Sequence, residues 1–300
     1  MTNWRRARNA TADGSDTVNS AWLCRSKQLA KSCRCIFYLL FVSTVVLASS
    51  IPAIAGGCPT EPDWSYSGND GPQYWNQLFP NQCGNGSRQS PFNIATVQFT
   101  RSLLPKLDFH YAEANVIYLD HDDQVQFDHG EGNYITIGGT RYDLINIHAH
   151  TPSEYTIDGQ QFPMEIHFVH QNSVSGQLAV VGVMVALGKS DPGVIEPPTP
   201  EDPALVDLKL TDLLPKRKNY VRFNGSLTTP GNTTTPPRCA EGVLWTEMLT
   251  PITMSADQIA AFEDSARACW GTSVTNRPLQ PSNGRFLLIP WSFATTDDAS

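Results

Sequence analysis

The stretch that decides the fold is Tyr142-Asp-Leu-Ile-Asn-Ile-His-Ala-His150, followed by Met164-Glu-Ile-His-Phe-Val-His170. Both segments are short and rich in apolar residues, and Asp158-Gly159 between them favours a turn. They are therefore predicted to form neighbouring antiparallel strands. Because successive side chains of a strand point to opposite faces, His148 and His150 are expected on one face of the sheet.

Similar short runs continue on both sides of this pair, separated by glycines that favour tight turns. One helix is expected at residues 255–269, where Ser255 can act as the N-cap. The sequence predicts a mainly β fold: a single domain with a large, mostly antiparallel, twisted central sheet flanked by short helices and long loops. Strands are expected at residues 116–119, 125–127, 134–137, 142–150, 164–169 and 178–186.

The first 55 residues differ in character from the rest of the chain. Residues 36–55 are apolar or small, follow a basic tract and end in Ala53-Ile54-Ala55. This is the layout of a secretory signal with a small-residue cleavage site. Residues 1–55 are therefore expected to be a signal or targeting leader, and residues 56–300 the single folded domain of the mature chain. A retained membrane anchor and a bipartite organelle-targeting leader are the alternatives.

Composition limits the partners. The chain of 300 residues has a formal net charge of -8, with 40% hydrophobic and 17% charged residues, which is typical of a globular protein. The leader is basic, so residues 56–300 hold 14 Lys and Arg against 27 Asp and Glu. An acidic body argues against a nucleic-acid partner. A membrane is expected as a partner only if the leader is retained, and the sequence indicates no particular oligomeric state.

Three histidines have the placement of metal ligands. His148 and His150 share a strand face, and His167 on the neighbouring strand can bring a third imidazole to it. Three imidazoles and an open fourth position suit a catalytic zinc ion, which lowers the pKa of bound water to ~7. Asn146 and Glu165 each precede a ligand by two residues, so they are expected to accept the second ring N–H. Buried structural histidines are the alternative, and structural or exposed roles are expected for His110, His129 and His170.

Longer motifs around these histidines resemble a known family. The run His148-Ala-His-Thr-Pro-Ser-Glu-Tyr155 and the run at residues 164–170 resemble the zinc-binding core of the α-class carbonic anhydrases. Further segments agree with that family in the same order, so the resemblance covers about residues 62–288. These segments are Trp64-Ser-Tyr-Ser-Gly68, Gln89-Ser-Pro-Phe-Asn-Ile94, Gly225-Ser-Leu-Thr-Thr-Pro230, Glu241-Gly-Val-Leu-Trp245 and Asn276-Arg-Pro-Leu-Gln-Pro281.

The resemblance implies an activity and a set of roles. Members of the family are zinc enzymes that convert carbon dioxide reversibly to bicarbonate and a proton, by attack of zinc-bound hydroxide. The resemblance implies that Thr228 orients the hydroxide and that Glu154 accepts the proton of the Thr228 hydroxyl. The zinc ligands would be His148, His150 and His167, with Asn146 and Glu165 behind them. Substrate contacts would come from Thr228, Thr229, Val169, Val180, Leu227 and Trp245.

The proton shuttle and two positions near the ligands depart from the family pattern. His121 matches the shuttle position, but Tyr118-Leu-Asp-His121 stands where the family usually has Asn-x-Gly-His. A histidine that titrates near neutral pH suits this task. Ala149 replaces the usual aromatic residue between the first two ligands, and Tyr155 replaces a histidine.

An insertion makes the threonine assignment ambiguous. The tract at residues 228–239 lengthens what is a contiguous Thr-Thr-Pro-Pro-Cys in the family. Thr234 and Thr235 are therefore rivals for the roles given to Thr228 and Thr229. The earlier pair is favoured because Gly-Ser-Leu precedes it without interruption.

Four cysteines remain beyond the leader: Cys58, Cys83, Cys239 and Cys269. An even number of cysteines suggests disulfides, which form in exported proteins. The resemblance implies a Cys83–Cys239 disulfide, which leaves Cys58 and Cys269 to pair with each other or with another chain. The expected compartment is extracellular or periplasmic, with an organelle lumen such as the thylakoid lumen as the alternative. Glycosylation triplets begin at Asn85, Asn224 and Asn232.

Two function classes follow from this sequence. The first is a zinc-dependent carbonic anhydrase, a lyase with Zn²⁺ as cofactor and carbon dioxide and bicarbonate as small-molecule partners. The second is a carbonic-anhydrase-like binding or adhesion module that has lost catalysis. Non-catalytic relatives typically lack zinc histidines, and all three are present here, which favours the enzyme.

Overall fold

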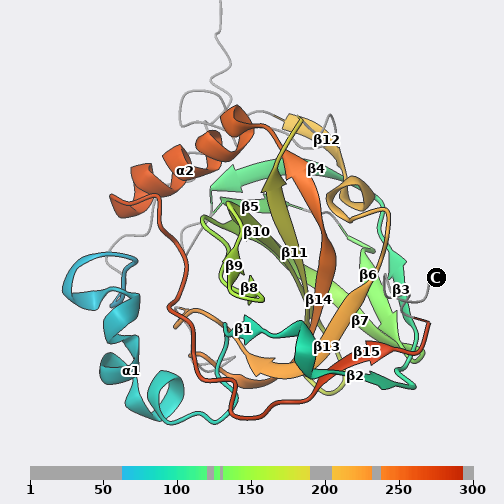
Figure 1. The fold of residues 1–300 in the computed structure, drawn as a ribbon. Helices are drawn as coiled ribbons and strands as arrows, with labels where there is room; N and C mark the ends of the chain where they lie inside the picture. The colour runs from blue at the N-terminus through green and yellow to red at the C-terminus, as the bar shows by residue number, and fades with distance from the viewer. Residues whose placement is uncertain (1–62, 120–124, 129–130, 190–204, 232–237, 293–300) are drawn as a thin grey trace, which may run out of the picture. The chain divides into compact units, whose positions relative to one another are not determined.

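A twisted sheet of twelve strands dominates the molecule (Figure 1). The computed structural model describes residues 63–119, 125–128, 131–189, 205–231 and 238–292. The strands of this sheet are β2 (Phe99–Ser102), β3 (Leu107–His110), β4 (Glu113–Leu119), β5 (Val125–Asp128), β6 (Tyr134–Ile137), β7 (Thr140–His150), β10 (Met164–Gln171), β11 (Leu178–Leu187), β12 (Leu205–Lys209), β13 (Tyr220–Ser226), β14 (Glu241–Met254) and β15 (Leu287–Pro290).

The order of strands across the sheet is β12-β4-β5-β7-β10-β11-β14-β13-β15-β2, with β6 beside β7 and β3 beside β6. Neighbouring strands are antiparallel except in the pairs β11–β14 and β15–β2. The predicted mainly β fold with a mostly antiparallel central sheet is therefore confirmed. A small second sheet joins β1 (Asn93–Ile94), β8 (Thr156–Ile157) and β9 (Gln160–Gln161).

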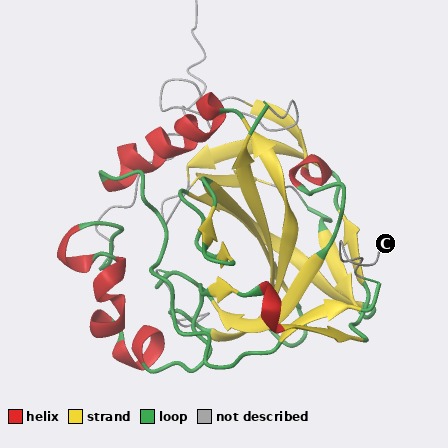
Figure 2. Ribbon diagram, in the orientation of Figure 1, coloured by secondary structure: helices red, strands yellow, loops and turns green. Residues whose placement is uncertain are grey.

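Short helices lie beside the sheet (Figure 2). The longest in the described part of the chain, α2 (Ala256–Trp270), begins where the sequence predicted. The Ser255 hydroxyl accepts a hydrogen bond from the Gln258 backbone N–H, and the Ser255 backbone N–H donates one to the Gln258 side-chain oxygen. It ends at Gly271, whose φ of 66° places it in the left-handed region that favours glycine. The other helical segments are α1 (Trp75–Leu78), η1 (Gly68–Asp70), η2 (Pro72–Tyr74), η3 (Pro80–Gly84), η4 (Thr96–Gln98) and η5 (Leu210–Leu213).

Two apolar layers cover the two faces of the sheet. On β10, Ile166 and Phe168 belong to one layer, together with Ile259 and Phe262 of α2. His167 and its neighbours in alternation face the other layer, which contains Trp245. The sheet therefore buries its central strands on both faces. Of the three candidate ligands, His150 and His167 are buried and His148 is half-buried.

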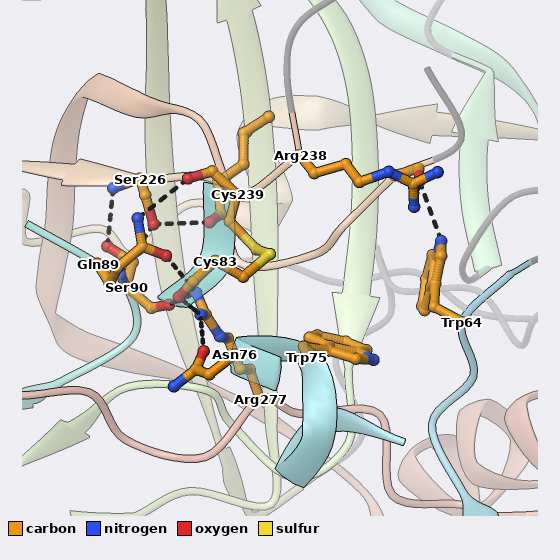
Figure 3. The surroundings of a disulfide bond; sticks show 12 residues. Trp64, Trp75, Asn76, Cys83, Gln89, Ser90, Ser226, Arg238, Cys239 and Arg277 are labelled. Carbon is orange, nitrogen blue, oxygen red and sulfur yellow. Dashed lines mark hydrogen bonds between the residues drawn. A yellow bond between two sulfur atoms is a disulfide. The ribbon is translucent and has the colours of Figure 1, made fainter. Parts of the chain in front are cut away.

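A disulfide and an aromatic cluster fix the N-terminal part of the described chain (Figure 3). Cys83 and Cys239 are joined with a Cα–Cα distance of 5.1 Å across 156 residues. Trp64 packs edge-on against Trp75 and stacks on Trp270 at the end of α2, with ring centroids 5.2 and 5.3 Å apart. These contacts hold residues 63–84 against the loop that carries Cys239.

Several sequence-based expectations fall outside the described residues. The leader predicted for residues 1–55 is one of them. The described residues belong to one compact unit. Cys269 is disulfide-bonded, but Cys58, its suggested partner, is not described. In the described part of the chain, no helix is long and apolar enough to cross a membrane.

Removing the disulfide is expected to destabilise the fold. Because the Cys83–Cys239 bond closes a long loop, it restricts the unfolded chain, so replacing both cysteines by serine should lower the free energy of unfolding by about 2–5 kcal/mol. Equilibrium unfolding in guanidinium chloride, followed by tryptophan fluorescence, measures the change. A loss below about 0.5 kcal/mol, the range of neutral surface substitutions, would contradict the prediction.

Candidate metal centre

The pairing of β7 with β10 brings three histidines together. In this antiparallel register His167 lies directly opposite His148, and Glu165 lies opposite His150. One ring nitrogen from each of the three histidines lies within 4.8 Å of the others. The ring centroids of His150 and His167 are 4.7 Å apart, and those of His148 and His167 are 5.2 Å apart. The three imidazoles therefore converge on one point.

The second nitrogen of each ring is held by a neighbouring acceptor. Nδ1 of His148 donates to the Asn146 side-chain oxygen, and Nδ1 of His150 donates to the Thr275 carbonyl at 2.6 Å. Nε2 of His167 donates to Glu165 Oε1 at 2.8 Å. These contacts fix the tautomer of each ring. They leave Nε2 of His148, Nε2 of His150 and Nδ1 of His167 directed toward the shared point.

Burial keeps the three rings neutral. It lowers the pKa of His150 to about 4 and the pKa of His167 to about 3. The pKa of His148 is also lowered well below its usual value, by burial and then by the two neighbouring imidazoles. Neutral imidazole is the form that coordinates a metal, and three such nitrogens without a carboxylate or thiolate suit zinc. The donor set therefore fits the ion that the sequence predicted.

Glu165 connects a candidate ligand to the adjoining loop. While Oε1 accepts from His167, Oε2 accepts the backbone N–H groups of Glu154 at 2.8 Å and Tyr155 at 2.9 Å. Burial raises the pKa of Glu165, and the two backbone donors act in the opposite direction. The same carboxyl group thus positions both the His167 ring and the segment that carries Glu154.

Glu154 lies beside the histidines and Thr228. Its Oε1 accepts the Arg277 backbone N–H at 2.9 Å, and its Oε2 is 3.5 Å from His150 Nε2. Burial raises the pKa of Glu154, whereas His150, a hydrogen bond from the Thr228 hydroxyl and the Arg277 N–H lower it. Thr228 is itself buried. The favoured threonine therefore lies close enough to lower the pKa of the glutamate that the resemblance pairs with it.

An apolar wall borders the histidines. Trp245 packs edge-on against His167, with ring centroids 4.9 Å apart, and its Nε1 donates to the Ser226 carbonyl at 3.0 Å. Val169, Val180 and Leu227 belong to the same apolar cluster as Trp245. Thr229 is half-buried next to Thr228 on the loop that follows β13. Of the residues expected to bind substrate, Trp245 therefore contacts a candidate ligand directly, and Val169, Val180 and Leu227 share its apolar cluster.

Comparison with known proteins decides the family. Residues 70–289 match the family described as eukaryotic-type carbonic anhydrase. The chain belongs to this carbonic anhydrase family. It is 35% identical over 235 residues to a carbonic anhydrase of Pectobacterium carotovorum, a match that spans 75% of this chain and 90% of that protein.

A plant relative and a solved structure agree with this assignment. Alpha carbonic anhydrase 2 of Arabidopsis thaliana is 33% identical over 236 residues, covering 72% of this chain and 92% of the relative. The α-carbonic anhydrase of Thermovibrio ammonificans, solved with the inhibitor sulfanilamide, superposes with a TM-score of 0.64 at 31% identity. That superposition covers 76% of this chain and 100% of the other chain. The α-class resemblance read from the sequence is confirmed.

Other predicted residues fall away from the centre or outside the described chain. His170 is buried, with its ring nitrogens near the Tyr111 hydroxyl at 2.7 Å and the Ala179 carbonyl at 3.2 Å, which is a structural role. His110 is exposed and stacks on Tyr134. The candidates that lie outside the described residues are His121, His129, Thr234 and Thr235.

Three residues around the site were missed at the sequence level. Thr275 accepts from His150, and Arg277, fully buried, donates from its side chain to Gln89, Ser90, Asn76 and Cys83. Arg277 lies in the motif at residues 276–281, but its role could not be inferred because its contacts join segments 187 to 201 residues apart. For Glu247 the sequence offered one indication of a special role, since it is an acidic residue within the apolar run of β14.

Glu247 is a buried carboxyl group behind the ligands. Neither of its oxygens makes a hydrogen bond within the described residues. Burial raises the pKa of Glu247 well above its usual value, and the neighbouring Glu165 carboxyl group raises it further, so both effects favour the neutral form. It packs against Gly182, where an added Cβ would lie 1.9 Å from Glu247 Oε2. A glycine is required there to make room for the carboxyl group.

The Glu165 side chain is expected to strengthen metal binding. A Glu165→Gln substitution replaces Oε2 by an NH₂ group, which cannot accept the Glu154 and Tyr155 N–H groups. The His167 ring then loses its fixed orientation, and zinc affinity should fall about 10- to 100-fold. Competition with a chromophoric chelator measures this affinity, with exposed Glu131→Gln as the control. Equal affinities in wild type and Glu165→Gln would contradict the assigned role.

Proposed function

We propose that this chain is a zinc-dependent carbonic anhydrase that interconverts carbon dioxide and bicarbonate, with His148, His150 and His167 as zinc ligands. The observation that carries the proposal is the convergence of three neutral imidazoles whose second nitrogens are all held by acceptors. When bound, zinc acts as a Lewis acid that lowers the pKa of a coordinated water to about 7. The chain's own residues then orient the reactants and move the proton.

Thr228 and Glu154 are proposed to orient the nucleophile. Thr228, whose side chain lowers the pKa of Glu154, is proposed to donate a hydrogen bond to the Glu154 carboxylate, which leaves the Thr228 oxygen to accept a hydrogen bond from the attacking group. Glu154 must be ionised for this, and the Arg277 N–H supports the ionised form. The contact between Thr228 and Glu154 supports Thr228 over Thr234, although Thr234 lies outside the described residues.

The apolar wall is proposed to bind carbon dioxide, with Thr229 as a polar contact beside it. The substrate is small, uncharged and without hydrogen-bond donors, so it suits a surface formed by apolar side chains. Close packing of Trp245 against His167 also excludes water from the side of the ligand ring. The wall consists of Val169, Val180, Leu227 and Trp245.

A catalytic role is favoured over that of a binding or adhesion module. A module that only binds a partner has no need for the ligand set, its acceptors and the Thr228–Glu154 contact together. The Cys83–Cys239 disulfide supports an oxidising compartment, extracellular, periplasmic or within an organelle lumen. The partners proposed are carbon dioxide and bicarbonate.

Hydration of carbon dioxide in a stopped-flow instrument tests the proposed function. The purified protein should hydrate carbon dioxide far above the rate in buffer. It should lose this activity when zinc is stripped and regain it with one equivalent of zinc per chain, because the activity depends on one zinc ion held by the three histidines. Folded protein that binds zinc but hydrates at the buffer rate would contradict the proposal and favour a binding module.

The two threonine candidates can be separated by substitution. Thr228→Ala removes the hydroxyl that is proposed to orient the attacking group. The hydration rate should therefore fall about 100-fold, which is at the lower end of the effect of a positioned proton donor or acceptor. Thr234→Ala is the matched variant and should retain nearly wild-type kcat/KM. The reverse order of effects would transfer the orienting role to Thr234.

His121 is proposed to carry the proton to solvent. His121→Ala should lower kcat at least about tenfold while leaving kcat/KM nearly unchanged, because proton transfer follows the attack on substrate. Imidazole added to the buffer should restore much of the lost kcat. An unchanged kcat at low buffer concentration would show that another group carries the proton.

A further inference from the structure

Tyr155 contacts two separate parts of the candidate site. It is fully buried, and its backbone N–H donates at 2.9 Å to Oε2 of Glu165, the carboxyl group that holds His167. At the other end of the residue, the phenol hydroxyl donates to Ser90 Oγ at 2.7 Å, across 65 residues of sequence. Tyr155 stands where the family usually has a histidine, so this hydroxyl is not part of the family pattern.

Ser90 connects the Tyr155 hydroxyl to the strand that leads to Thr228. Ser90 and Ser226 lie side by side (Figure 3). The Ser226 backbone N–H donates to Ser90 Oγ at 3.1 Å, and the Ser90 backbone N–H donates to Ser226 Oγ at 2.9 Å. Ser226 is the last residue of β13 and precedes Thr228 by two residues. The Ser90 oxygen therefore accepts from Tyr155 and from the end of this strand at the same time.

The end of β13 packs closely around Ser90. A Cβ added at Gly225 would lie 2.4 Å from Ser90 Oγ and 2.8 Å from Cδ1 of Trp245, so a glycine is needed there. Ser90 and Ser226 are both fully buried, and the Ser226 hydroxyl donates to the Leu227 carbonyl at 2.7 Å. Because a close-packed interior transmits displacements, a shift of Ser90 would move the end of β13 with it.

The ring and the hydroxyl of Tyr155 make separate contacts. The ring centroid lies 4.9 Å from that of Trp245 and 5.5 Å from those of Phe92 and Phe223. Trp245 in turn packs against His167. A phenylalanine in place of the tyrosine would keep these ring contacts and the backbone N–H, and would lose only the hydrogen bond to Ser90.

The segments joined by this hydroxyl carry the residues proposed to orient the nucleophile. Tyr155 directly follows Glu154, and Ser226 lies two residues before Thr228. The contact through Ser90 therefore joins the same two segments as the proposed hydrogen bond from Thr228 to Glu154. A displacement of about 1 Å in an active site can cost about 100-fold in rate, so a second connection between these segments has a catalytic consequence.

We propose that the Tyr155 hydroxyl is a positioning group that acts through Ser90 and sets the place of Thr228 relative to Glu154. Tyr155 is thus not itself a catalytic residue. This role rests on the proposed function, because the orienting role of Thr228 is itself proposed. It extends that function by naming what holds the threonine in place.

Tyr155→Phe tests this role in stopped-flow hydration of carbon dioxide. The value of kcat/KM should fall about tenfold, because Thr228 is no longer held where it orients the attack. Zinc affinity, measured with a chromophoric chelator, should equal that of wild type, since the Tyr155 backbone N–H still donates to Glu165. An unchanged kcat/KM in the folded, zinc-loaded variant would overturn the proposal.

Tyr142→Phe is the matched control. Tyr142 is also buried but belongs to the apolar cluster on the other face of the sheet, and its hydroxyl donates to Gln177 Oε1 at 3.0 Å. Both variants should show a similar fall in the free energy of unfolding, since each loses one tyrosine hydrogen bond. Only Tyr155→Phe should lower kcat/KM. Equal falls in kcat/KM in the two variants would reduce the Tyr155 hydroxyl to a structural role and overturn the proposal.

A double substitution shows whether the effect of Tyr155 passes through Thr228. In the Thr228→Ala background, Tyr155→Phe should cause no further loss of kcat/KM, because the group that it positions is already absent. A second loss of the same size in that background would overturn the proposal.

Ser90→Ala removes the acceptor and should lower kcat/KM as much as Tyr155→Phe does. If Tyr155→Phe does not fold, Ser90→Ala decides the question, and a wild-type kcat/KM would overturn the proposal. The rate of the unmodified protein separates the two claims. Hydration at the buffer rate by wild type would contradict the proposed function and this role with it, whereas fast hydration by wild type and by both variants would contradict this role alone.

Discussion

The antiparallel register of β7 and β10 is the constraint on which the site depends. It sets His167 opposite His148 and Glu165 opposite His150, so a shift of one residue would turn these side chains to the other face of the sheet. Apolar residues on the opposite face, such as Ile147 and Phe168, lock this register because they must remain in the core. The same alternation therefore specifies both the hydrophobic core and the metal centre.

The polar side of this arrangement is held by contacts between distant parts of the chain. Glu165 joins the His167 ring to the backbone of the loop that carries Glu154, and Thr275 holds the His150 ring from a segment more than 120 residues away. Arg277 then links that segment to the N-terminal region through the Cys83 carbonyl. These hydrogen bonds fix the orientation of the ligand rings without a metal.

Much of this could be predicted from local patterns. Alternation and turn residues predicted the strands of the large sheet between residues 116 and 186, but not β2, β3 or β12 to β15. The capping residue Ser255 predicted the start of α2, and the two-residue spacing predicted Asn146 and Glu165 as partners of the ligands. Thr275, Arg277 and Glu247 could not be found in this way, because their roles arise from contacts between segments far apart in sequence.

The central claim is that three imidazoles alone hold the metal, through Nε2 of His148, Nε2 of His150 and Nδ1 of His167. A crystal structure with anomalous diffraction measured at the zinc absorption edge tests it most directly. The account predicts one zinc ion per chain, bound to these three nitrogens at about 2.0–2.1 Å with a fourth, non-protein position in a tetrahedral arrangement. A zinc ion bound by other side chains, or by a different nitrogen of any of the three rings, would contradict it.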